Sequence, residues 1–367
     1  MVRLGVALLA SLAVPAHAAY TLERNSAGSN FFDGWTYWGN RDNLTNGAVN
    51  YVSQASSSHL AYVDAGTGNA IVKVDNTSTL AYGALRNSVR ITTSETYGIG
   101  SLFVLDALHL PFGCSVWPAF WTHAVSWPSG GELDIFEGVN LQQTNQVALH
   151  TVAGCYSSDT NVTAPHGTLQ STNCDYTVAA NQGCTFVDER NASYGEAFAR
   201  QGGGVYAAEL SSDAISVWFF PRDQVPADLR DSTSTPVPAG WGAPSAYYPQ
   251  SSCNINQYFA PQQITLNIAL CGDWAGQPGV FGTTCSGSCA DLVQDPRNYD
   301  DAYFEIASVR VYTGGVDTRS RAAASAVIGS LGGGTDAQGI SGASGRANPL
   351  RRTVAMGALF LSLLVSV

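Results

Sequence analysis

One short apolar segment carries three acidic side chains, Glu132, Asp134 and Glu137, and it constrains the fold more than any other feature of the chain. Side chains alternate between the two faces of a β-strand, so Glu132 and Asp134 share a face, whereas Glu137 would point to the opposite one. One extra residue near Ile135 or Phe136 would form a β-bulge and return Glu137 to the face of the other two. The sequence therefore predicts a bulged strand that displays three carboxyl groups on one surface.

Three carboxyl groups a few ångströms apart cannot all ionise freely, so one keeps its proton while another is charged. Such a pair supplies an acid and a base together. Retaining glycosidases use two carboxyls about 5 Å apart, one as the nucleophile and the other as the acid and later the base. The alternative is an ordinary amphipathic edge strand whose acids lie in water.

Tryptophans flank this strand in the sequence, at Trp117, Trp121 and Trp127. Sugar rings have flat apolar faces and polar rims, so indole planes beside carboxyl groups suit a saccharide cleft. Each tryptophan taken alone fits a hydrophobic core better. Their clustering around one acidic strand is what favours the cleft.

Several motifs together resemble the fungal laminarinase-type enzymes of glycoside hydrolase family 16, over about residues 20–313. They are Trp117–Trp121, Gly131–Asn140, Leu149–Thr151 with Gly154-Cys155, Gly202–Ala207 and Cys271–Gly276.

The resemblance assigns a role to each residue of the Glu-x-Asp-x-x-Glu motif. It implies that Glu132 is the nucleophile, Asp134 the assisting aspartate and Glu137 the acid/base. Leu133 and Phe136 replace the commoner isoleucines of the family, and both substitutions preserve size and polarity.

The resemblance also implies a set of substrate-binding residues: Trp117, Trp121, Trp127 and Trp274 in sugar subsites, with Asn140 and His150 donating hydrogen bonds near the reacting ring. His150 lies within an apolar run, where a hydrogen-bonded structural histidine is an equal alternative. His123 is expected in a loop without a task. No cofactor and no metal are expected, because no Cys-x-x-Cys pair recurs and no His-Glu-x-x-His occurs.

The substrate class follows from the resemblance alone. It implies an endo-1,3(4)-β-glucanase that hydrolyses internal β-1,3 bonds of β-glucans, and adjacent β-1,4 bonds as a further option, with retention of configuration. Two alternatives remain open: a cell-wall glucan transglycosylase and a non-catalytic β-glucan-binding lectin of the same fold. A serine hydrolase is disfavoured, since the chain contains no Gly-x-Ser-x-Gly.

The fold prediction rests on alternating and β-rich runs separated by turn-forming clusters, without a sustained helical period. These runs cover residues 88–93, 101–105, 147–152, 205–210, 215–220, 264–270 and 304–307. We expect an all-β protein, an antiparallel two-sheet β-jelly-roll sandwich of the concanavalin A-like lectin/glucanase type with a concave substrate cleft. Its catalytic domain is predicted at residues 19–313.

The amino terminus is typical of a secretory signal peptide over residues 1–18, with Arg3, an apolar run at 4–14 and an Ala-x-Ala site at 16–18. Eight cysteines then indicate a disulfide framework in an oxidising compartment. Although 105 connectivities are possible, local pairs such as Cys174–Cys184 and Cys285–Cys289 are expected. Four sequons fit surface loops of a secreted glycoprotein, at Asn43, Asn76, Asn161 and Asn191.

The carboxyl terminus suggests attachment to a membrane. Residues 314–345 are rich in Gly, Ser and Ala and are expected to form a flexible linker. Residues 346–367 combine a polar spacer with a short apolar tail and are typical of a glycosylphosphatidylinositol (GPI) anchor signal. The alternatives are a short transmembrane anchor or a tail without a role. The expected location is therefore secreted and GPI-anchored at the cell surface or wall.

The charge balance excludes some partners. The formal net charge is −11 and Lys73 is the single lysine of the chain. Nucleic acid and anionic membrane surfaces are poor partners without a basic patch, whereas a neutral β-glucan needs none. We expect a monomer that contacts the membrane only through its lipid anchor.

Overall fold

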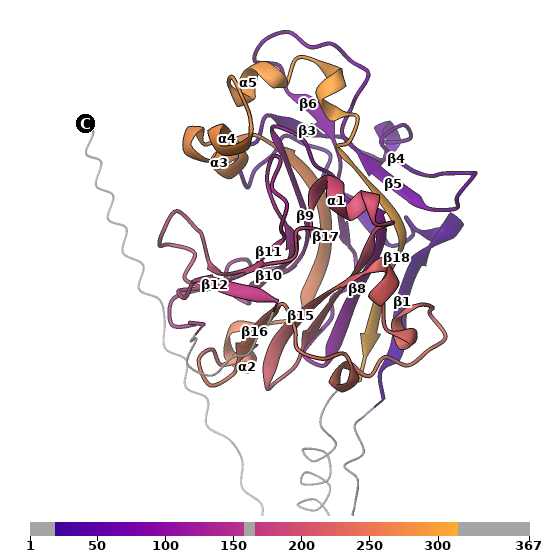
Figure 1. Ribbon diagram of the computed structural model, residues 1–367, viewed down its shortest axis with the longest axis vertical. Coiled ribbons are helices and arrows are strands. Elements are labelled where there is room, and N and C mark those ends of the chain that lie inside the picture. The colour runs from indigo at the N-terminus through magenta and orange to yellow at the C-terminus, as the bar shows by residue number, and fades with distance from the viewer. Residues whose placement is uncertain (1–18, 158–165, 315–367) are drawn as a thin grey trace, which may run out of the picture. The chain divides into compact units, whose positions relative to one another are not determined.

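The computed structural model describes residues 19–157 and 166–314, which form two packed antiparallel β-sheets (Figure 1). Three features predicted from the sequence lie outside the described residues: the signal peptide, the tail with nearly all of the linker, and the sequon at Asn161.

The first layer, which we call the back sheet, has its strands in the order β16-β15-β14-β8-β18-β5-β4, and β1 also pairs with β18. The strands are β1 (Thr21–Ala27), β4 (Ala61–Val63), β5 (Ala70–Lys73), β8 (Ser101–His109), β14 (Gly204–Leu210), β15 (Ala214–Pro221), β16 (Ala246–Pro249) and β18 (Tyr303–Thr313).

The second layer, the cleft sheet, has the order β12-β13-β11-β10-β9-β17-β7-β2. Its strands are β2 (Trp35–Tyr37), β7 (Arg90–Thr93), β9 (Val116–Ala124), β10 (Glu132–Glu137), β11 (Gln146–His150), β12 (Gly167–Ser171), β13 (Cys184–Asp188) and β17 (Gln262–Leu270). A short parallel pair is formed by β3 (Val49–Tyr51) and β6 (Arg86–Ser88).

Helices are few and short, as the absence of a helical period predicts. They are α1 (Gly195–Arg200), α2 (Ile255–Tyr258), α3 (Gly272–Ala275), α4 (Pro278–Thr284) and α5 (Cys289–Leu292), with 3₁₀ turns η1 (Gly28–Asn30), η2 (Gln54–Ser56), η3 (Arg222–Gln224), η4 (Ala227–Leu229), η5 (Pro238–Gly240) and η6 (Pro296–Tyr299). Figure 1 shows α3, α4 and α5 grouped at one end of the sandwich.

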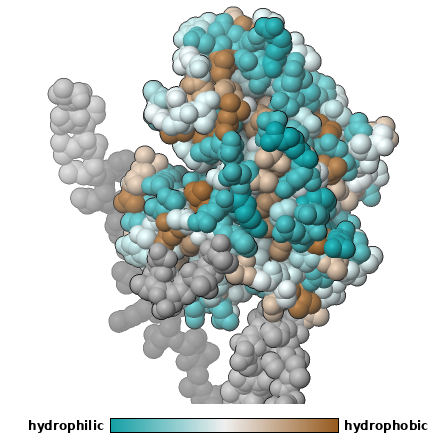
Figure 2. Space-filling view, in the orientation of Figure 1, coloured by the Kyte–Doolittle hydropathy of each residue, from teal (hydrophilic) through white to brown (hydrophobic). Residues whose placement is uncertain are grey.

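Within the described ranges, no helix has the length and apolar character needed to cross a bilayer. The face shown in Figure 2 is mainly hydrophilic, with small groups of hydrophobic residues distributed over it.

Strands β8, β14 and β15 of the back sheet are buried on both faces, which explains their long apolar runs. In β8, Phe103 and Leu105 belong to the main core between the sheets, whereas Leu102 and Val104 belong to a second apolar cluster. The segment from η3 to β16 contributes to that cluster. Buried Arg310 holds this segment by donating to two of its backbone carbonyls, at 2.6 Å each.

Every predicted β-rich run lies in or overlaps observed strands, and the two-sheet sandwich is confirmed. One run is divided: residues 88–93 break at Val89, between β6 and β7. His123 was expected in a loop, but it lies on β9 and pairs with Glu132 of β10.

Four disulfides join the eight cysteines: Cys114–Cys285, Cys155–Cys253, Cys174–Cys184 and Cys271–Cys289. The prediction of Cys174–Cys184 is confirmed. The prediction of Cys285–Cys289 is wrong. Cys285 follows α4 and Cys289 begins α5, and each pairs with a cysteine beside the cleft sheet, Cys114 before β9 or Cys271 after β17. Nearness in sequence therefore did not decide this pairing.

Candidate active site

Strand β10 contains the predicted bulge. Its pairing with β9 slips between Asp134 and Phe136, and its pairing with β11 slips between Asp134 and Glu137. Leu133, Ile135 and Phe136 all join the main core, so two consecutive residues point inward. The alternation resumes one residue later, and Glu137 returns to the cleft face beside the other acidic side chains.

The side chain of Asn145 satisfies the backbone at this bulge. Its Nδ2 donates to the carbonyl of Ile135 at 3.0 Å, and its Oδ1 accepts from the amide of Glu137 at 2.9 Å. Buried backbone groups without partners are costly, so one side-chain amide replaces the ladder bonds that the extra residue removes.

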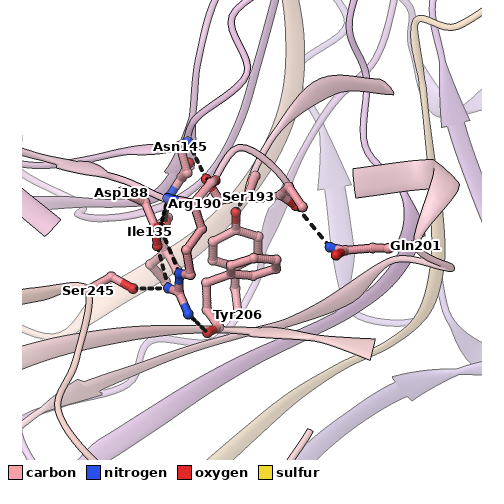
Figure 3. Close-up of polar contacts among 10 residues, drawn as sticks. Ile135, Asn145, Asp188, Arg190, Ser193, Gln201, Tyr206 and Ser245 are labelled. Carbon is pink, nitrogen blue, oxygen red and sulfur yellow. Dashed lines mark hydrogen bonds and ion pairs between the residues drawn. The ribbon is translucent and has the colours of Figure 1, made fainter. Parts of the chain in front are cut away.

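A polar network surrounds Asn145 (Figure 3). The backbone amide of Asn145 donates to Ser193 Oγ at 2.9 Å, and the Tyr206 hydroxyl donates to the Ser193 carbonyl. Arg190 pairs with Asp188 through two nitrogens, at 2.8 and 2.5 Å. Because Asp188 donates its own amide to the carbonyl of Asn145 at 2.9 Å, the Asn145 backbone is held on both sides.

The three carboxyl groups open into a cleft with a volume of about 610 Å³ that crosses the cleft sheet. Its lining includes alternate residues of β9, namely Trp117, Ala119, Trp121 and His123, together with His150, Asn267 and Trp274. The cleft therefore combines carboxylates with indole rings, the mixture expected for a carbohydrate site.

Two indoles hold the two glutamates. Trp117 Nε1 donates to Glu137 Oε1 at 2.8 Å, and Trp127 Nε1 donates to Glu132 Oε2. Trp117 and Trp127 thus orient carboxyl groups besides offering apolar faces. Trp274 lies edge-on to Trp117, with ring centroids 5.5 Å apart.

His150 forms the centre of a short polar chain. Its Nε2 lies 3.2 Å from Asp134 Oδ2, and its Nδ1 lies 2.9 Å from Asn181 Oδ1. Both partners present oxygen atoms, an arrangement that suits a cationic imidazole donating from both ring nitrogens. Asn181 belongs to the loop that the Cys174–Cys184 disulfide closes.

Burial and the surrounding charges shift the pKa values of this cluster. Burial, followed by the charge of Asp134, raises the pKa of Glu132 and of Glu137 above the usual 4.5. Both side chains remain partly open to the cleft, so water moderates the rise. Burial alone would lower the pKa of His150, but its hydrogen bond to Asp134 and the carboxylate charges raise it to about 10.

Glu132, Asp134 and His150 also have ligand atoms within 4.8 Å of one another, a spacing that a metal ion could use. However, the His150 cation already provides the positive charge that a metal would bring to Asp134. The ion pair between Asp134 and His150 therefore explains why these ligand atoms lie close together.

Trp121 and Asn140 differ in their relation to the cleft. Trp121 lines it and donates to Asn267 Oδ1 at 2.7 Å. Asn140 is 1% exposed and does not line the cleft. Its side chain accepts from the amide of Ser115 at 2.8 Å and donates to the carbonyl of Ala275 at 3.1 Å. Asn140 thus joins the segment before β9 to the end of α3.

Several lining residues were missed by the sequence reasoning. Arg90 lies on β7 with its guanidinium over Trp38, 5.0 Å from the ring centroid, and donates to Asn43 Oδ1 at 2.9 Å. The alternation of residues 88–93 could have suggested that Arg90 faces the cleft. No sequence signal marks the loop residues at 42–45 and 179–182, which line the cleft because of tertiary packing.

Comparison with protein-family models matches residues 35–312 to the XgeA-like catalytic domain of glycoside hydrolase family 16. A probable glycosidase of Schizosaccharomyces pombe is 40% identical over 296 residues, which cover 80% of this chain and 69% of that protein. A probable endo-1,3(4)-β-glucanase of Neosartorya fischeri is 40% identical over 320 residues, covering 83% of this chain and 47% of that protein. The chain therefore spans about half the length of the latter relative.

Solved structures show the same architecture. Laminarinase 16A from Phanerochaete chrysosporium, with β-glucans in both donor and acceptor sites, matches with a TM-score of 0.76 and 41% identity, covering 81% of this chain and 100% of that one. An elongating family 16 β-1,3-glucosyltransferase matches with a TM-score of 0.72 and 35% identity, covering 80% of this chain and 100% of that one.

Proposed function

Because this chain belongs to glycoside hydrolase family 16, we propose that it is an endo-1,3(4)-β-glucanase that cleaves internal β-1,3 bonds of β-glucans with retention of configuration. Adjacent β-1,4 bonds are a second substrate. The observation that carries the proposal is the bulge of β10, which brings Glu132, Asp134 and Glu137 into one tryptophan-lined cleft.

In the first step, Glu132 attacks the anomeric carbon and Glu137 protonates the departing glycosidic oxygen. The bond from the anomeric carbon to that oxygen breaks, and a covalent glycosyl-enzyme forms on Glu132. In the second step, Glu137 removes a proton from water, which attacks the anomeric carbon and releases Glu132. Two inversions give net retention.

Burial, followed by the charge of Asp134, raises the pKa of both glutamates, whereas His150 and one indole hydrogen bond oppose the rise at each. The division of roles therefore rests on the order of the two glutamates in the Glu-x-Asp-x-x-Glu motif. Glu137 must start protonated, and its burial beside Asp134 raises its pKa in that direction. Asp134 lies between the two glutamates on β10 and is held by its contact with His150.

Trp117, Trp121, Trp127 and Trp274 are proposed as apolar faces of the sugar subsites. His150, expected from the sequence to donate to the sugar, has both ring nitrogens engaged and is proposed to act near the reacting ring through Asp134. The cleft runs over five neighbouring strands of the cleft sheet, β11, β10, β9, β17 and β7, which suits binding within a long glucan chain instead of at its end. Residues 19–313 are proposed as the catalytic domain. A non-catalytic lectin is a weaker proposal, because the carboxyl groups and their indole partners are all in the cleft.

Transfer to a second glucan is the other candidate reaction, favoured by the similarity to an elongating β-1,3-glucosyltransferase. In that reaction a sugar hydroxyl replaces water in the second step, and Glu137 removes its proton. Hydrolysis and transfer differ only in the acceptor that reaches the glycosyl-enzyme.

The fungal glucanase relatives and the four disulfides indicate an extracellular enzyme. We propose that the signal at residues 1–18 directs its secretion and that a GPI anchor, added near the end of the 314–345 linker, retains it at the cell surface. Among the described sequons, Asn43 and Asn191 are exposed and Asn76 is partly exposed, which suits attachment of glycans.

The test uses Glu132→Gln and Glu137→Gln with laminarin, lichenan and cellulose. Both variants should fold and lose nearly all turnover, while exposed Glu23→Gln on β1 keeps it. Shorter products indicate hydrolysis and longer products indicate transfer. Proton NMR of the first-formed reducing end should show the β-anomer. An active Glu132→Gln enzyme would refute the assignment of the nucleophile.

A further inference from the structure

We propose that Asn145 is a positioning residue for the reaction: its side-chain amide holds the bulge of β10 and thereby fixes Glu137 in the cleft. This inference rests on the proposed function and deepens it, because it explains how the acid/base is kept in register with the nucleophile. Asn145 does not line the cleft, so it acts through Glu137.

The geometry at the bulge supports this role. The Asn145 side chain donates to the Ile135 carbonyl and accepts from the Glu137 amide, so one planar group spans both sides of the extra residue. Asn145 is 1% exposed, and water cannot readily replace it. A bulge without this amide would leave two buried backbone groups unpaired, and the strand would relax toward another register.

Asn145 is itself held firmly. Ser193 Oγ accepts from its backbone amide, and its backbone carbonyl accepts from the amide of Asp188. Arg190 fixes Asp188 and donates to Ser245 Oγ at 2.6 Å, so the network extends to the loop before β16 (Figure 3). The back sheet contributes through Tyr206 of β14.

Glu132 depends on different contacts. It lies before the bulge, where β10 pairs regularly with His123 of β9 and His150 of β11. Loss of Asn145 should therefore displace Glu137 and leave Glu132 in place. The resulting defect should affect proton donation to the leaving group and spare nucleophilic attack.

Substrates that differ in leaving group separate these two tasks. The leaving sugar of a β-glucan needs a proton on its oxygen. A dinitrophenyl β-laminaribioside instead releases a stable phenolate, which needs no proton. The full-length protein is compared with Asn145→Ala and Asn145→Asp. The burst of dinitrophenolate reports the first step, and added azide replaces the water that Glu137 must activate in the second.

We expect Asn145→Ala to lower kcat on laminarin by about 10²-fold, within the range for loss of a general acid, and to change the burst rate by less than about threefold. Azide should accelerate its steady-state turnover of the aryl glycoside. Asn145→Asp keeps the acceptor for Glu137 but loses the donor to Ile135, so its defect should be intermediate. Glu137→Gln should show the same pattern as Asn145→Ala, and Glu132→Gln should lose the burst.

Ser88→Ala is the matched control, because its hydroxyl makes a buried hydrogen bond to the Ile268 carbonyl at 2.7 Å outside the cleft. It should lower Tm without changing the leaving-group dependence. If Asn145→Ala fails to fold, Ser193→Ala, which removes the acceptor for the Asn145 amide, is tested in the same way against Asn191→Gln, because both variants remove the sequon at Asn191. Equal losses on both substrates, or full activity on laminarin, would overturn the inference. A fully active Glu137→Gln enzyme would instead refute the proposed acid/base.

Discussion

Replacing Glu132 or Glu137 by glutamine should stabilise the folded protein at neutral pH. Burial and the charge of Asp134 raise the pKa of Glu132 and of Glu137 above their usual 4.5. Such a group contributes its full stability below pH 4.5, and that contribution is lost as the pH rises through the raised value, because the unfolded chain releases the proton first. Above this range an ionised carboxylate destabilises the fold.

The size of the effect follows from the partial exposure of both glutamates. A pKa raised by one unit in the folded state corresponds to about 1.4 kcal/mol, so each replacement should add at least about 1 kcal/mol to the free energy of unfolding. Glutamine keeps the acceptor oxygen for Trp117 or Trp127, so little is lost in return. The double variant should gain less than the sum, because removing one charge already relieves the other.

Urea unfolding at about pH 4 and about pH 8 measures this effect. The gain should appear at the higher pH and largely vanish at the lower one, where the wild-type carboxyls are protonated too. Exposed Glu23→Gln is the control and should change little at either pH. A lower free energy of unfolding for Glu137→Gln at the higher pH would mean that the folded site stabilises the carboxylate, and the reasoning would fail.

Three further predictions test other contacts. Trp117→Phe removes the donor that lowers the pKa of Glu137, so that pKa should rise and the basic limb of the kcat/KM profile should move to higher pH; a shift to lower pH would contradict it. Ala180 lies at φ 52°, so Ala180→Gly should raise the free energy of unfolding by about 0.5–1 kcal/mol, whereas Ala197→Gly in α1 should lower it by a similar amount. Loss of Cys114–Cys285, with a separation of 171 residues, should cost about 5 kcal/mol, against about 3 kcal/mol for Cys174–Cys184, with a separation of 10; equal losses in urea unfolding would argue against a chain-entropy origin.

The bulge could be predicted from the sequence because the side chains of a strand point to only two faces. Glu132 and Glu137 are five positions apart, so a shared face required one extra residue, and the structure has it at Ile135. The β-rich runs at 101–105, 205–210 and 215–220 could be predicted equally well, since β8, β14 and β15 are buried on both faces and mostly apolar.

The remaining parts of the site depend on tertiary contacts that no local pattern encodes. Asn145 was visible only as a residue near the acidic strand, and its contact with Ile135 exists because β10 and β11 pair across the bulge. The sequence suggested a sugar contact for Asn140, yet the residue is buried outside the cleft lining, with its amide engaged by Ser115 and by Ala275 of α3. Cys285 and Cys289 are close in sequence, but each forms a disulfide with a cysteine elsewhere in the fold.

The extra residue in β10 has a consequence for how this fold can vary. Removing Ile135 would leave Glu-Leu-Asp-Phe-Glu, in which strict alternation alone displays all three acids on one side. A shorter strand of that kind would have no orphaned backbone groups and no use for an asparagine at position 145. The bulged strand with Asn145 and the shorter strand without it each satisfy their backbone groups. A chain with only one of these two changes would not. The deletion of Ile135 and the loss of the Asn145 amide should therefore occur together.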